Sequence, residues 1–396
     1  MQYGLLFAVT LMTAVGNLGL VSVMPAIGRA LAIPDALIAC TFSLSALAWA
    51  VTAPRWARLS DRLGRKPLLL VGLAGFTASM LGCALVVVAG LHAAMAPLAI
   101  FAVFAVVRST YGLFGSAAPT AAQALIADST EGHARIQALS GLAGALSLGT
   151  IAGPAVASLF VFSDTTGLAG PPFAFAAAGI LLMLLVLLAM PRDRPTHGTA
   201  GPHPRGQLWL DRAMRPLLID GFVVASAQAV NLYTLGFAVL DSVPTGGNSQ
   251  WWIGLTMSLG AASSLAAQTS FVRLFKPSPW AMLGGGSAVV VAGNVLALVA
   301  GGLYPLIAGF VLAMFGYGLS RPGFAAAASL AVGPERQSAV AGAVSSIAGA
   351  SIAAPPVLAV GLYQFWHGAP LALAAGGALW VAHSTRRNRR MFPASD

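Results

Sequence analysis

Twelve long runs of apolar residues dominate this chain of 396 residues. A helix needs about 20 consecutive apolar residues to cross the hydrocarbon core of a bilayer. Charged residues make up only 8% of the chain, against about 25% in soluble domains. The runs are continuous rather than alternating, which excludes a membrane β-barrel, and lipid then leaves only the helix. The sequence therefore predicts an all-α membrane protein with twelve transmembrane helices, near residues 4–28, 34–56, 68–90, 95–124, 136–162, 172–190, 215–240, 251–273, 280–300, 303–330, 338–364 and 367–384.

The basic residues predict how these helices are oriented, because cytoplasmic connections are enriched in Lys and Arg. With both termini in the cytoplasm, 18 of the 21 Lys and Arg residues lie on that side. Arg29 lies on the outer side, and Arg108 and Arg321 lie within the runs. The net charge of +10 therefore reflects topology rather than nucleic-acid binding. We expect a multi-pass protein of the cell inner (plasma) membrane.

The two halves of the chain resemble each other weakly. Three pairs of short matches occur in the same order, with offsets of 206, 202 and 210 residues: Tyr111-Gly112-Leu113 with Tyr317-Gly318-Leu319, Gly153-Pro154 with Pro355-Pro356, and Lys66-Pro67 with Lys276-Pro277. Such a duplication predicts two pseudo-symmetric six-helix bundles with a substrate cavity between them. We expect an N-terminal bundle over 1–190, a flexible cytoplasmic linker over 191–214 and a C-terminal bundle with a basic tail over 215–396.

The segment after the second run carries the clearest motif. Residues 57–67 read A-R-L-S-D-R-L-G-R-K-P. They resemble the cytoplasmic signature loop of the major facilitator superfamily, G-x-L-x-D-R-x-G-R-(K/R), with Ala57 in place of the first Gly. An ordinary basic loop would explain the Arg and Lys residues but not Asp61 together with Gly64. The resemblance implies the major facilitator fold and a conformational latch made of Asp61, Arg62, Gly64, Arg65, Lys66 and Asp128.

Two further motifs lie within runs. Arg108 is near the middle of the fourth run, where a charge costs at least about 2.5–3.5 kcal/mol and should face the protein interior or water. The segment 108–112 resembles the superfamily motif R-x-x-x-G, which implies a role in coupling protonation to transport; a structural ion pair is the alternative. In the fifth run, Gly149, Gly153 and Pro154 resemble the antiporter motif of twelve-helix drug:proton exporters, although close helix packing also uses small residues.

Few polar residues remain as candidates for a substrate cavity. Exporters of this type often carry an acid in the first helix, and the first run of this chain has none. Asp220, about one turn inside the seventh run, is the acid expected within the membrane. We therefore expect Asp220 and Arg108 to take part in proton coupling, with a pair between Asp220 and Arg215 as the alternative. The cavity candidates, each explained equally well by a helix–helix hydrogen bond, are Asn17, Gln123, Gln228, Asn231, Tyr233, Tyr317 and Arg321.

Taken together, these features predict a transporter and no catalytic residues. The sequence contains no nucleophile elbow, metal-ligand cluster or phosphate-binding glycine loop, so we expect no enzyme activity, no cofactor and no metal. The resemblance favours proton-coupled efflux of a small amphiphilic molecule, such as a drug or a siderophore-like metabolite. Proton-coupled uptake of a small organic anion or sugar is the alternative. Protons, a small-molecule substrate and the lipid bilayer are the expected partners of a monomer.

Overall fold

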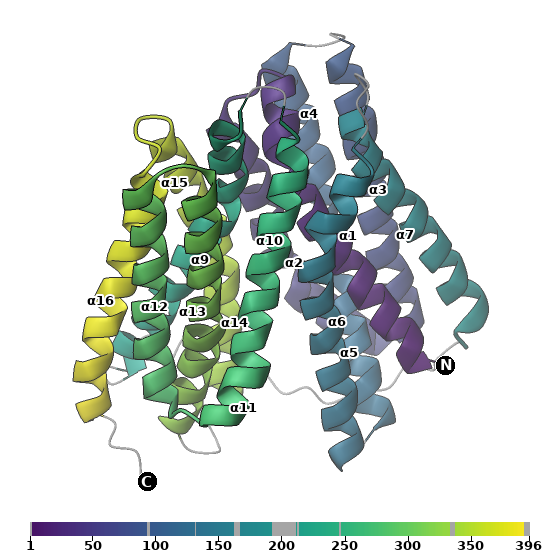
Figure 1. Ribbon diagram of the computed structural model, residues 1–396. Coiled ribbons are helices and arrows are strands. Elements are labelled where there is room, and N and C mark those ends of the chain that lie inside the picture. Colours follow the sequence, from purple (N-terminus) through teal and green to yellow (C-terminus); the bar gives the residue numbers. More distant parts are fainter. Residues whose placement is uncertain are drawn as a thin grey trace. The chain divides into compact units, whose positions relative to one another are not determined.

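The computed structural model describes residues 2–92, 96–130, 132–161, 167–191, 211, 214–244, 247–332 and 337–391, and all secondary structure within these ranges is helical (Figure 1). The helices form twelve membrane-length segments in chain order. The first six are α1 (Gln2–Ala30), α2 (Asp35–Leu63), α3 (Arg65–Leu91), a composite of α4 (Pro97–Thr110), the π-helix η1 (Tyr111–Gly115) and α5 (Ala117–Ser129), α6 (Gly132–Leu159), and α7 (Gly170–Ala189) after the short 3₁₀ turn η2 (Gly167–Ala169).

The second six segments follow the same plan. They are α9 (Met214–Ser242), a composite of α10 (Ser249–Ala266), the π-helix η3 (Ala267–Phe271) and α11 (Val272–Phe275), α12 (Pro279–Ala300), α13 (Leu303–Leu330), a pair of α14 (Gln337–Ala353) and α15 (Pro355–Tyr363), and α16 (Ala369–Met391). Among the described residues, ten helices are long and apolar enough to cross a membrane. The prediction of twelve helices is confirmed.

The described residues form two compact units. Unit 1 comprises those of Met1–Ala200 together with Gln250–Ser258, and unit 2 comprises those of Gly201–Ser249 and Leu259–Asp396. The predicted linker over 191–214 lies outside the described residues except for Pro191, Asp211 and Met214.

Helix pairing within each unit follows one pattern. In unit 1, α1 packs on α6, α3 packs on α7, and the α4–η1–α5 segment packs on both α2 and α3. In unit 2, α9 packs on α14, α12 packs on α16, and α13 packs on both α12 and η3. The first helix of each six therefore pairs with the fifth, and the third pairs with the fourth and the sixth. The two sets of six helices thus share one pairing pattern, which the weak sequence repeat did not specify.

Two local expectations are wrong. The signature segment is not a loop, because α2 continues to Leu63 and α3 begins at Arg65. Gly64 alone makes the turn, with φ 90° and ψ 169°, a backbone conformation that is essentially restricted to glycine. The eleventh segment is not one helix, because it is interrupted at Ala354, before two prolines that lack the N–H groups needed to continue the ladder.

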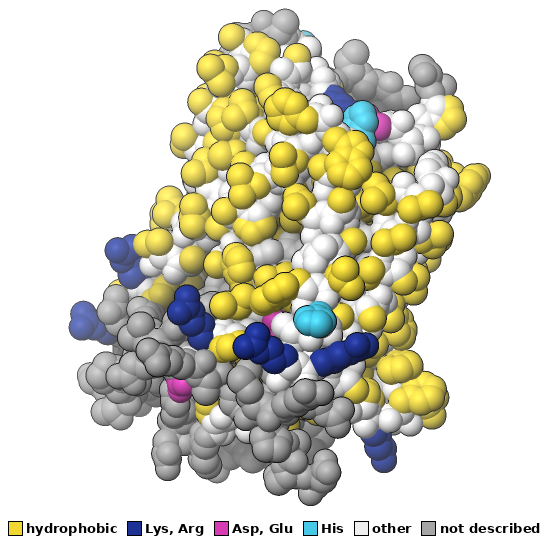
Figure 2. Space-filling model, turned by 90° about the vertical axis from the view of Figure 1, so that its left-hand side faces the viewer, with side chains coloured by type: hydrophobic (Ala, Val, Ile, Leu, Met, Phe, Trp, Pro, Cys, Tyr) yellow, Lys and Arg dark blue, Asp and Glu magenta, His cyan; other side chains and the backbone are white. Residues whose placement is uncertain are grey.

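The surface agrees with a lipid environment. Large hydrophobic side chains such as Leu188, Leu98 and Val106 are exposed by 82%, 67% and 70%. The face in Figure 2 is mostly hydrophobic, and most of its Lys and Arg side chains lie towards one end. A water-soluble monomer rarely exposes such contiguous apolar surface.

Candidate functional site

Arg108 is the central charged residue of unit 1. Its side chain is 2% exposed, at the end of α4. One terminal nitrogen, Nη2, donates a hydrogen bond to the carboxamide oxygen of Asn17 on α1. The guanidinium carbon lies 4.6 Å from the ring centre of Tyr111 and 5.3 Å from that of Phe42 on α2. Cation–π attraction of this kind is strongest where water is excluded, so α1, α2 and η1 together stabilise a charge inside the unit.

The π-helix that follows Arg108 depends on polar side chains of α2. A π-turn disturbs the regular helical ladder, and its carbonyl groups need partners in lipid. Ser45 donates to the Arg108 carbonyl at 3.2 Å, Thr52 donates to the Gly112 carbonyl at 3.2 Å, and the Trp56 indole donates to the Leu113 carbonyl at 2.7 Å. The side chains of α2 therefore fix both the π-turn and the residue that precedes it.

Close packing against α2 also explains the glycine of the fourth-helix motif. A Cβ atom on Gly112 would lie 2.2 Å from the Ser45 carbonyl oxygen and 2.9 Å from the Ala48 Cβ. Only a residue without a side chain fits at this point. The predicted motif residues Arg108 and Gly112 are thus placed together, with the charge facing Asn17 and the glycine facing α2.

The predicted latch residues lie at the connection between α2 and α3. Arg65 Nε is 2.9 Å from Asp128 Oδ2 at the end of α5, and Arg65 Nη1 donates to the Ser60 hydroxyl at 2.7 Å. The Arg65 side chain is 7% exposed and that of Asp128 is 36% exposed. Arg62 is exposed, and the side chain of Asp61 lies outside the described residues. The structure therefore brings together Arg65 and Asp128 of this set.

Lys66 makes a different contact. Its ammonium group donates to the carbonyl of Leu187 at 2.8 Å and also to that of Met190. These carbonyls belong to the end of α7, where a cation interacts favourably with the helix dipole. Lys66 therefore connects the signature segment to the last turn of the sixth helix, a partner that the sequence did not reveal.

The predicted antiporter residues form a close seam between α6 and α1. A Cβ on Gly149 would lie 2.4 Å from the Ala14 Cβ, and one on Gly153 would lie 2.6 Å from the Val15 carbonyl oxygen. Pro154 lies within α6, which continues through it to Leu159. The glycines of this motif therefore allow α6 and α1 to pack closely, as the packing explanation predicts.

Unit 2 places the predicted coupling acid in its interior. Asp220 on α9 is 0% exposed and accepts a hydrogen bond from the Ser384 hydroxyl on α16. Arg215, one turn earlier, is exposed. Among the other predicted residues, Gln228 accepts a hydrogen bond from Arg321 at 3.0 Å, and both Tyr317 and Asn231 are buried.

Not all cavity candidates come together. Arg321 and Gln123 are exposed, whereas Tyr233 and Asn17 are partly buried. Tyr317 and Arg321 are one helical turn apart, but Tyr317 is buried beside Asn294 of α12 whereas Arg321 is exposed. The described residues contain no group of three or more His, Cys, Asp or Glu side chains that could hold a metal ion.

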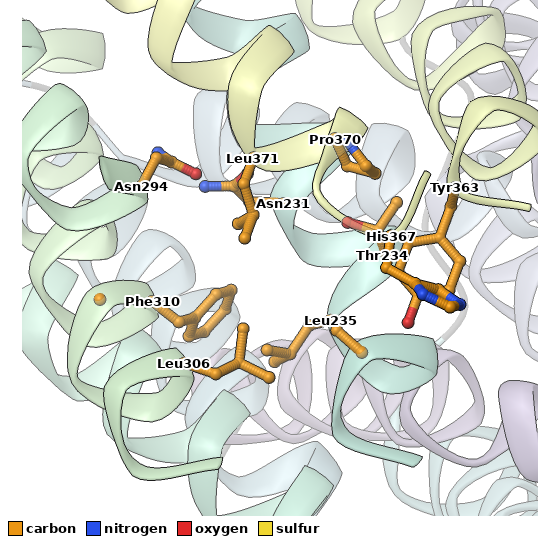
Figure 3. Close-up of a pocket in the computed structure, with 12 residues that line it drawn as sticks. Asn231, Thr234, Leu235, Asn294, Leu306, Phe310, Tyr363, His367, Pro370 and Leu371 are labelled. Carbon is orange, nitrogen blue, oxygen red and sulfur yellow. The ribbon is translucent and has the colours of Figure 1, made fainter. Parts of the chain in front are cut away.

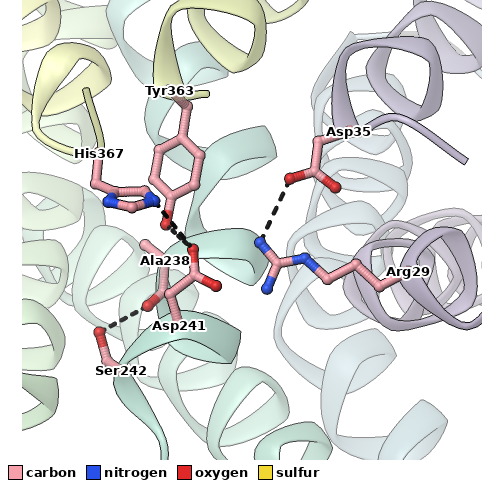
Figure 4. A network of polar contacts seen from close by, with 7 residues as sticks. All are labelled: Arg29, Asp35, Ala238, Asp241, Ser242, Tyr363 and His367. Atoms are coloured by element: carbon pink, nitrogen blue, oxygen red, sulfur yellow. Dashed lines mark hydrogen bonds and ion pairs between the residues drawn. The ribbon is translucent and has the colours of Figure 1, made fainter. Parts of the chain in front are cut away.

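The sequence predicted Asn231 but not the polar residues that lie near it in unit 2, Asn294, Asp241, Tyr363 and His367. A small cavity of about 20 Å³ (Figure 3) lies among α9, α12, α13, α15 and α16, with Asn231 and Asn294 among its lining residues. Beside it, Tyr363 donates to Asp241 Oδ2 at 2.5 Å, and His367 Nε2 is 3.7 Å from the same oxygen (Figure 4). Asn294 was detectable as a strongly polar residue in the apolar run 280–300. The cluster at Asp241 was not, because it joins distant segments.

Comparison with known sequences identifies one family. Residues 6–356 match the sequence profile described as "Major Facilitator Superfamily". The chain is also 27% identical over 237 residues to the "Uncharacterized MFS-type transporter YqjV" of Bacillus subtilis (strain 168), an alignment that covers 57% of this chain and 53% of that protein. The chain thus spans about half the length of this relative.

Comparison with solved structures shows the same fold. The nucleoside transporter NupG gives a TM-score of 0.77 at 13% identity, covering 99% of this chain and all (100%) of that one. A bacterial homologue of the iron transporter ferroportin gives 0.75 at 14% identity, covering 98% of each chain. A bacterial homologue of the human lysosomal transporter Spinster gives 0.74 at 12% identity, covering 99% of this chain and 98% of that one. At such identities the likeness extends to the fold alone.

Proposed function

The chain belongs to the Major Facilitator Superfamily, and from that membership we propose that it is a secondary active transporter that exports a small amphiphilic organic molecule in exchange for protons. The observation that carries the proposal is the burial of Arg108 inside unit 1. A charge in a membrane span is expensive and is by default a sign of function. A hydrogen bond to Asn17 and ring contacts with Tyr111 and Phe42 hold the guanidinium in this position.

Asp220 is the proposed proton carrier in unit 2. It is fully buried and hydrogen-bonded to Ser384, so α9 and α16 are both in contact with it. Gain or loss of a proton at this carboxyl changes the charge inside the unit by one. Such a change alters the stability of alternative helix arrangements, which is the physical requirement for coupling.

The proposed latch is the segment 57–67 with Asp128. The ion pair of Arg65 and Asp128 ties the α2–α3 turn to the end of α5, and Lys66 ties it to the end of α7. These contacts would favour one arrangement of the three helices at the membrane face. We propose that they release and re-form as the transporter changes state.

Export is proposed because Gly149, Gly153 and Pro154 resemble the antiporter motif. The solved relatives are named for different cargoes, a nucleoside and iron among them, so the fold does not choose the substrate. The spans contain two arginines, Arg108 and Arg321, and one buried acid, Asp220. This excess of positive charge favours neutral, zwitterionic or anionic substrates. Siderophore-like metabolites and antibiotics of these charge types fit, and lipophilic cations do not.

The direction can be tested in everted membrane vesicles that contain the protein. With an acidic lumen, we expect accumulation of norfloxacin (zwitterionic) or carboxyfluorescein (anionic), collapse of accumulation by a protonophore, and little accumulation of ethidium (cationic). Release of these anionic or zwitterionic probes from the lumen down the proton gradient would instead establish uptake symport. Preference for ethidium would contradict the proposed charge of the substrate.

The coupling residues can be tested with the same vesicles. Arg108→Gln and Asp220→Asn should lose proton-driven accumulation while retaining exchange of labelled for unlabelled substrate, which needs no net proton movement. Asp220→Glu is the matched control, since it keeps an acid at the site. An Asp220→Asn protein with full proton-driven transport would remove Asp220 from the mechanism.

A further inference from the structure

The small cavity of unit 2 has a polar floor that none of the roles above uses. Asn231 on α9 and Asn294 on α12 are 3% and 1% exposed and line the cavity. Their side chains point towards one another across it in Figure 3. The Oδ1 atom of each has no hydrogen-bond partner among the described residues. The hydroxyl of Tyr317, buried beside Asn294, has no hydrogen-bond partner in the same set of residues. A buried polar atom without a partner destabilises a protein by about 1–3 kcal/mol, so a water molecule or a cation bound in the cavity would stabilise this floor.

The orientation of Asn294 is held by its own helix. Its Nδ2 group donates to the Val290 carbonyl at 2.9 Å, which directs Oδ1 away from that bond. The opposite wall is apolar, formed by Leu306, Phe310 and Leu371. An anion finds no Lys or Arg among the lining residues. The floor therefore selects for a species that is attracted by carbonyl-type oxygens.

The rim of the cavity adds negative charge. Tyr363 and His367 line it, and both contact the carboxylate of Asp241, which lies ten residues after Asn231 on α9. The rings of Tyr363 and His367 stack edge to face with centres 4.8 Å apart. An acid next to aromatic rings at the mouth attracts cations. In the predicted topology this end of α9 faces the outer side of the membrane.

Size restricts the ligand. The cavity volume is about 20 Å³, and about 10–15 Å³ is enough for a single water molecule. An organic substrate does not fit in this space. Divalent cations prefer several carboxylates, and the lining residues supply none. The volume suits either one water molecule or a small monovalent cation held by neutral oxygens, and the carboxylate of Asp241 at the rim favours the cation.

We propose that the cavity between α9 and α12 of unit 2 is a site for a small monovalent cation of Na⁺ size, bound by the carboxamide oxygens of Asn231 and Asn294 and attracted by Asp241 at the rim. Binding joins α9 to α12 and thereby stabilises one packing of unit 2. Because it is defined by binding alone, the site does not depend on the direction, the substrate or the coupling ion proposed above.

The test uses the purified full-length protein in detergent at constant pH and ionic strength. Choline chloride is replaced stepwise by NaCl while thermal unfolding is followed, and binding of ²²Na⁺ is measured at equilibrium. We expect a saturable rise in Tm, as for any ligand that binds only the folded state, and about one ²²Na⁺ per chain. Equal Tm values in both salts with no bound ²²Na⁺ would mean that only water fills the cavity, which overturns the proposal.

Variants locate the site. Asn294→Leu and Asn231→Leu keep the side-chain shape and should lose both the Tm response and ²²Na⁺ binding, and Asp241→Asn should weaken binding several-fold. Ser287→Ala is the matched control on α12, because the Ser287 hydroxyl is buried but already donates to Leu283 at 2.7 Å. Sodium binding that survives in Asn294→Leu would contradict the assignment. The wild-type measurement decides the question even if a variant fails to fold.

Discussion

The same three residues adopt different backbone conformations in the two units. Tyr111-Gly112-Leu113 begins the π-helix η1 in unit 1, whereas Tyr317-Gly318-Leu319 lies in the regular α-helix α13 of unit 2. The two glycines nevertheless allow the same close approach of a neighbouring helix. A Cβ on Gly112 would meet the carbonyl oxygen of Ser45 at 2.2 Å, and one on Gly318 would meet that of Ser264 at 2.5 Å. Packing is shared, and the conformation around it is not.

The residue four positions after the tyrosine explains part of the difference. In unit 1 it is Gly115, and the space for its Cβ is taken by the Tyr111 ring, whose Cδ2 would lie 2.5 Å away. In unit 2 it is Arg321, which is exposed, and the Tyr317 ring is buried beside Asn294 instead. The Tyr111 ring is thus free to cover Arg108. In unit 2 the residue at the position equivalent to Arg108, 206 residues later, is the uncharged Met314. Duplication preserved the helix seams and left each unit its own polar interior.

The largest expected effect concerns the two arginines. If only unit 1 stabilises a coupling charge, Arg108→Gln should lower the rate of proton-driven transport more than tenfold. This corresponds to an increase of more than about 1.4 kcal/mol in the activation free energy. Arg321→Gln should mainly raise KM, because this exposed side chain would bind substrate without coupling. Initial rates over a range of substrate concentrations give both values. Equal loss of rate in the two variants would mean that the units share the coupling task.

The next effect tests the shared glycine seam. Gly112→Ala and Gly318→Ala each place a methyl group against backbone that cannot rotate away, so each should destabilise the protein by about 1–3 kcal/mol. Gly141→Ala and Gly285→Ala are the controls in α6 and α12, because nothing lies within 4 Å of their Cβ positions. Thermal unfolding in detergent measures all four. A stable Gly318→Ala protein would show that the seam is strict only next to the π-helix.

The corresponding turns of the two units should respond differently to substitution. Gly64 has φ 90° and ψ 169° and Lys276 has φ 44° and ψ 49°. Gly64→Ala forces a side chain into a glycine-only region, at a cost of about 1–3 kcal/mol. Lys276→Gly relieves a left-handed residue that costs about 1–2 kcal/mol, although added backbone freedom in the unfolded chain offsets much of this gain. A fall in Tm for the first and an unchanged or raised Tm for the second is expected; destabilisation by both would contradict the comparison.

The smallest effect concerns the ion pair of unit 1. Arg65 and Asp128 form a bond of 2.9 Å, but Asp128 is 36% exposed, so solvent screens much of the interaction. A double-mutant cycle with Arg65→Gln and Asp128→Asn should give a coupling energy of about 1 kcal/mol. Unfolding midpoints of the wild type, both single variants and the double variant supply the cycle. Strictly additive changes would remove this pair from the proposed latch.

The amino-acid sequence determined the helices and their order. A bilayer admits an apolar run only as a helix, so composition and run length were sufficient to predict twelve segments. The weak repeat led to the prediction of a duplicated six-helix unit, whereas the pairing of the helices came from the structure. The sequence also predicted that Arg108 faces the protein interior or water, because a charge within a membrane span is costly. For Asp220 it left a pair with Arg215 open.

Only the tertiary structure decided which groups meet. The cavity of Asn231 and Asn294, the cluster at Asp241 and the contact of Lys66 with α7 each join residues from distant helices. Side-chain direction also depends on turns that a local pattern does not specify, as the identical tripeptides in η1 and α13 demonstrate. In lipid every apolar run must be a helix, because its backbone N–H and C=O groups find no other partners. Which helices pack together depends on their side-chain shapes and on which hydrogen-bond partners their polar atoms can reach.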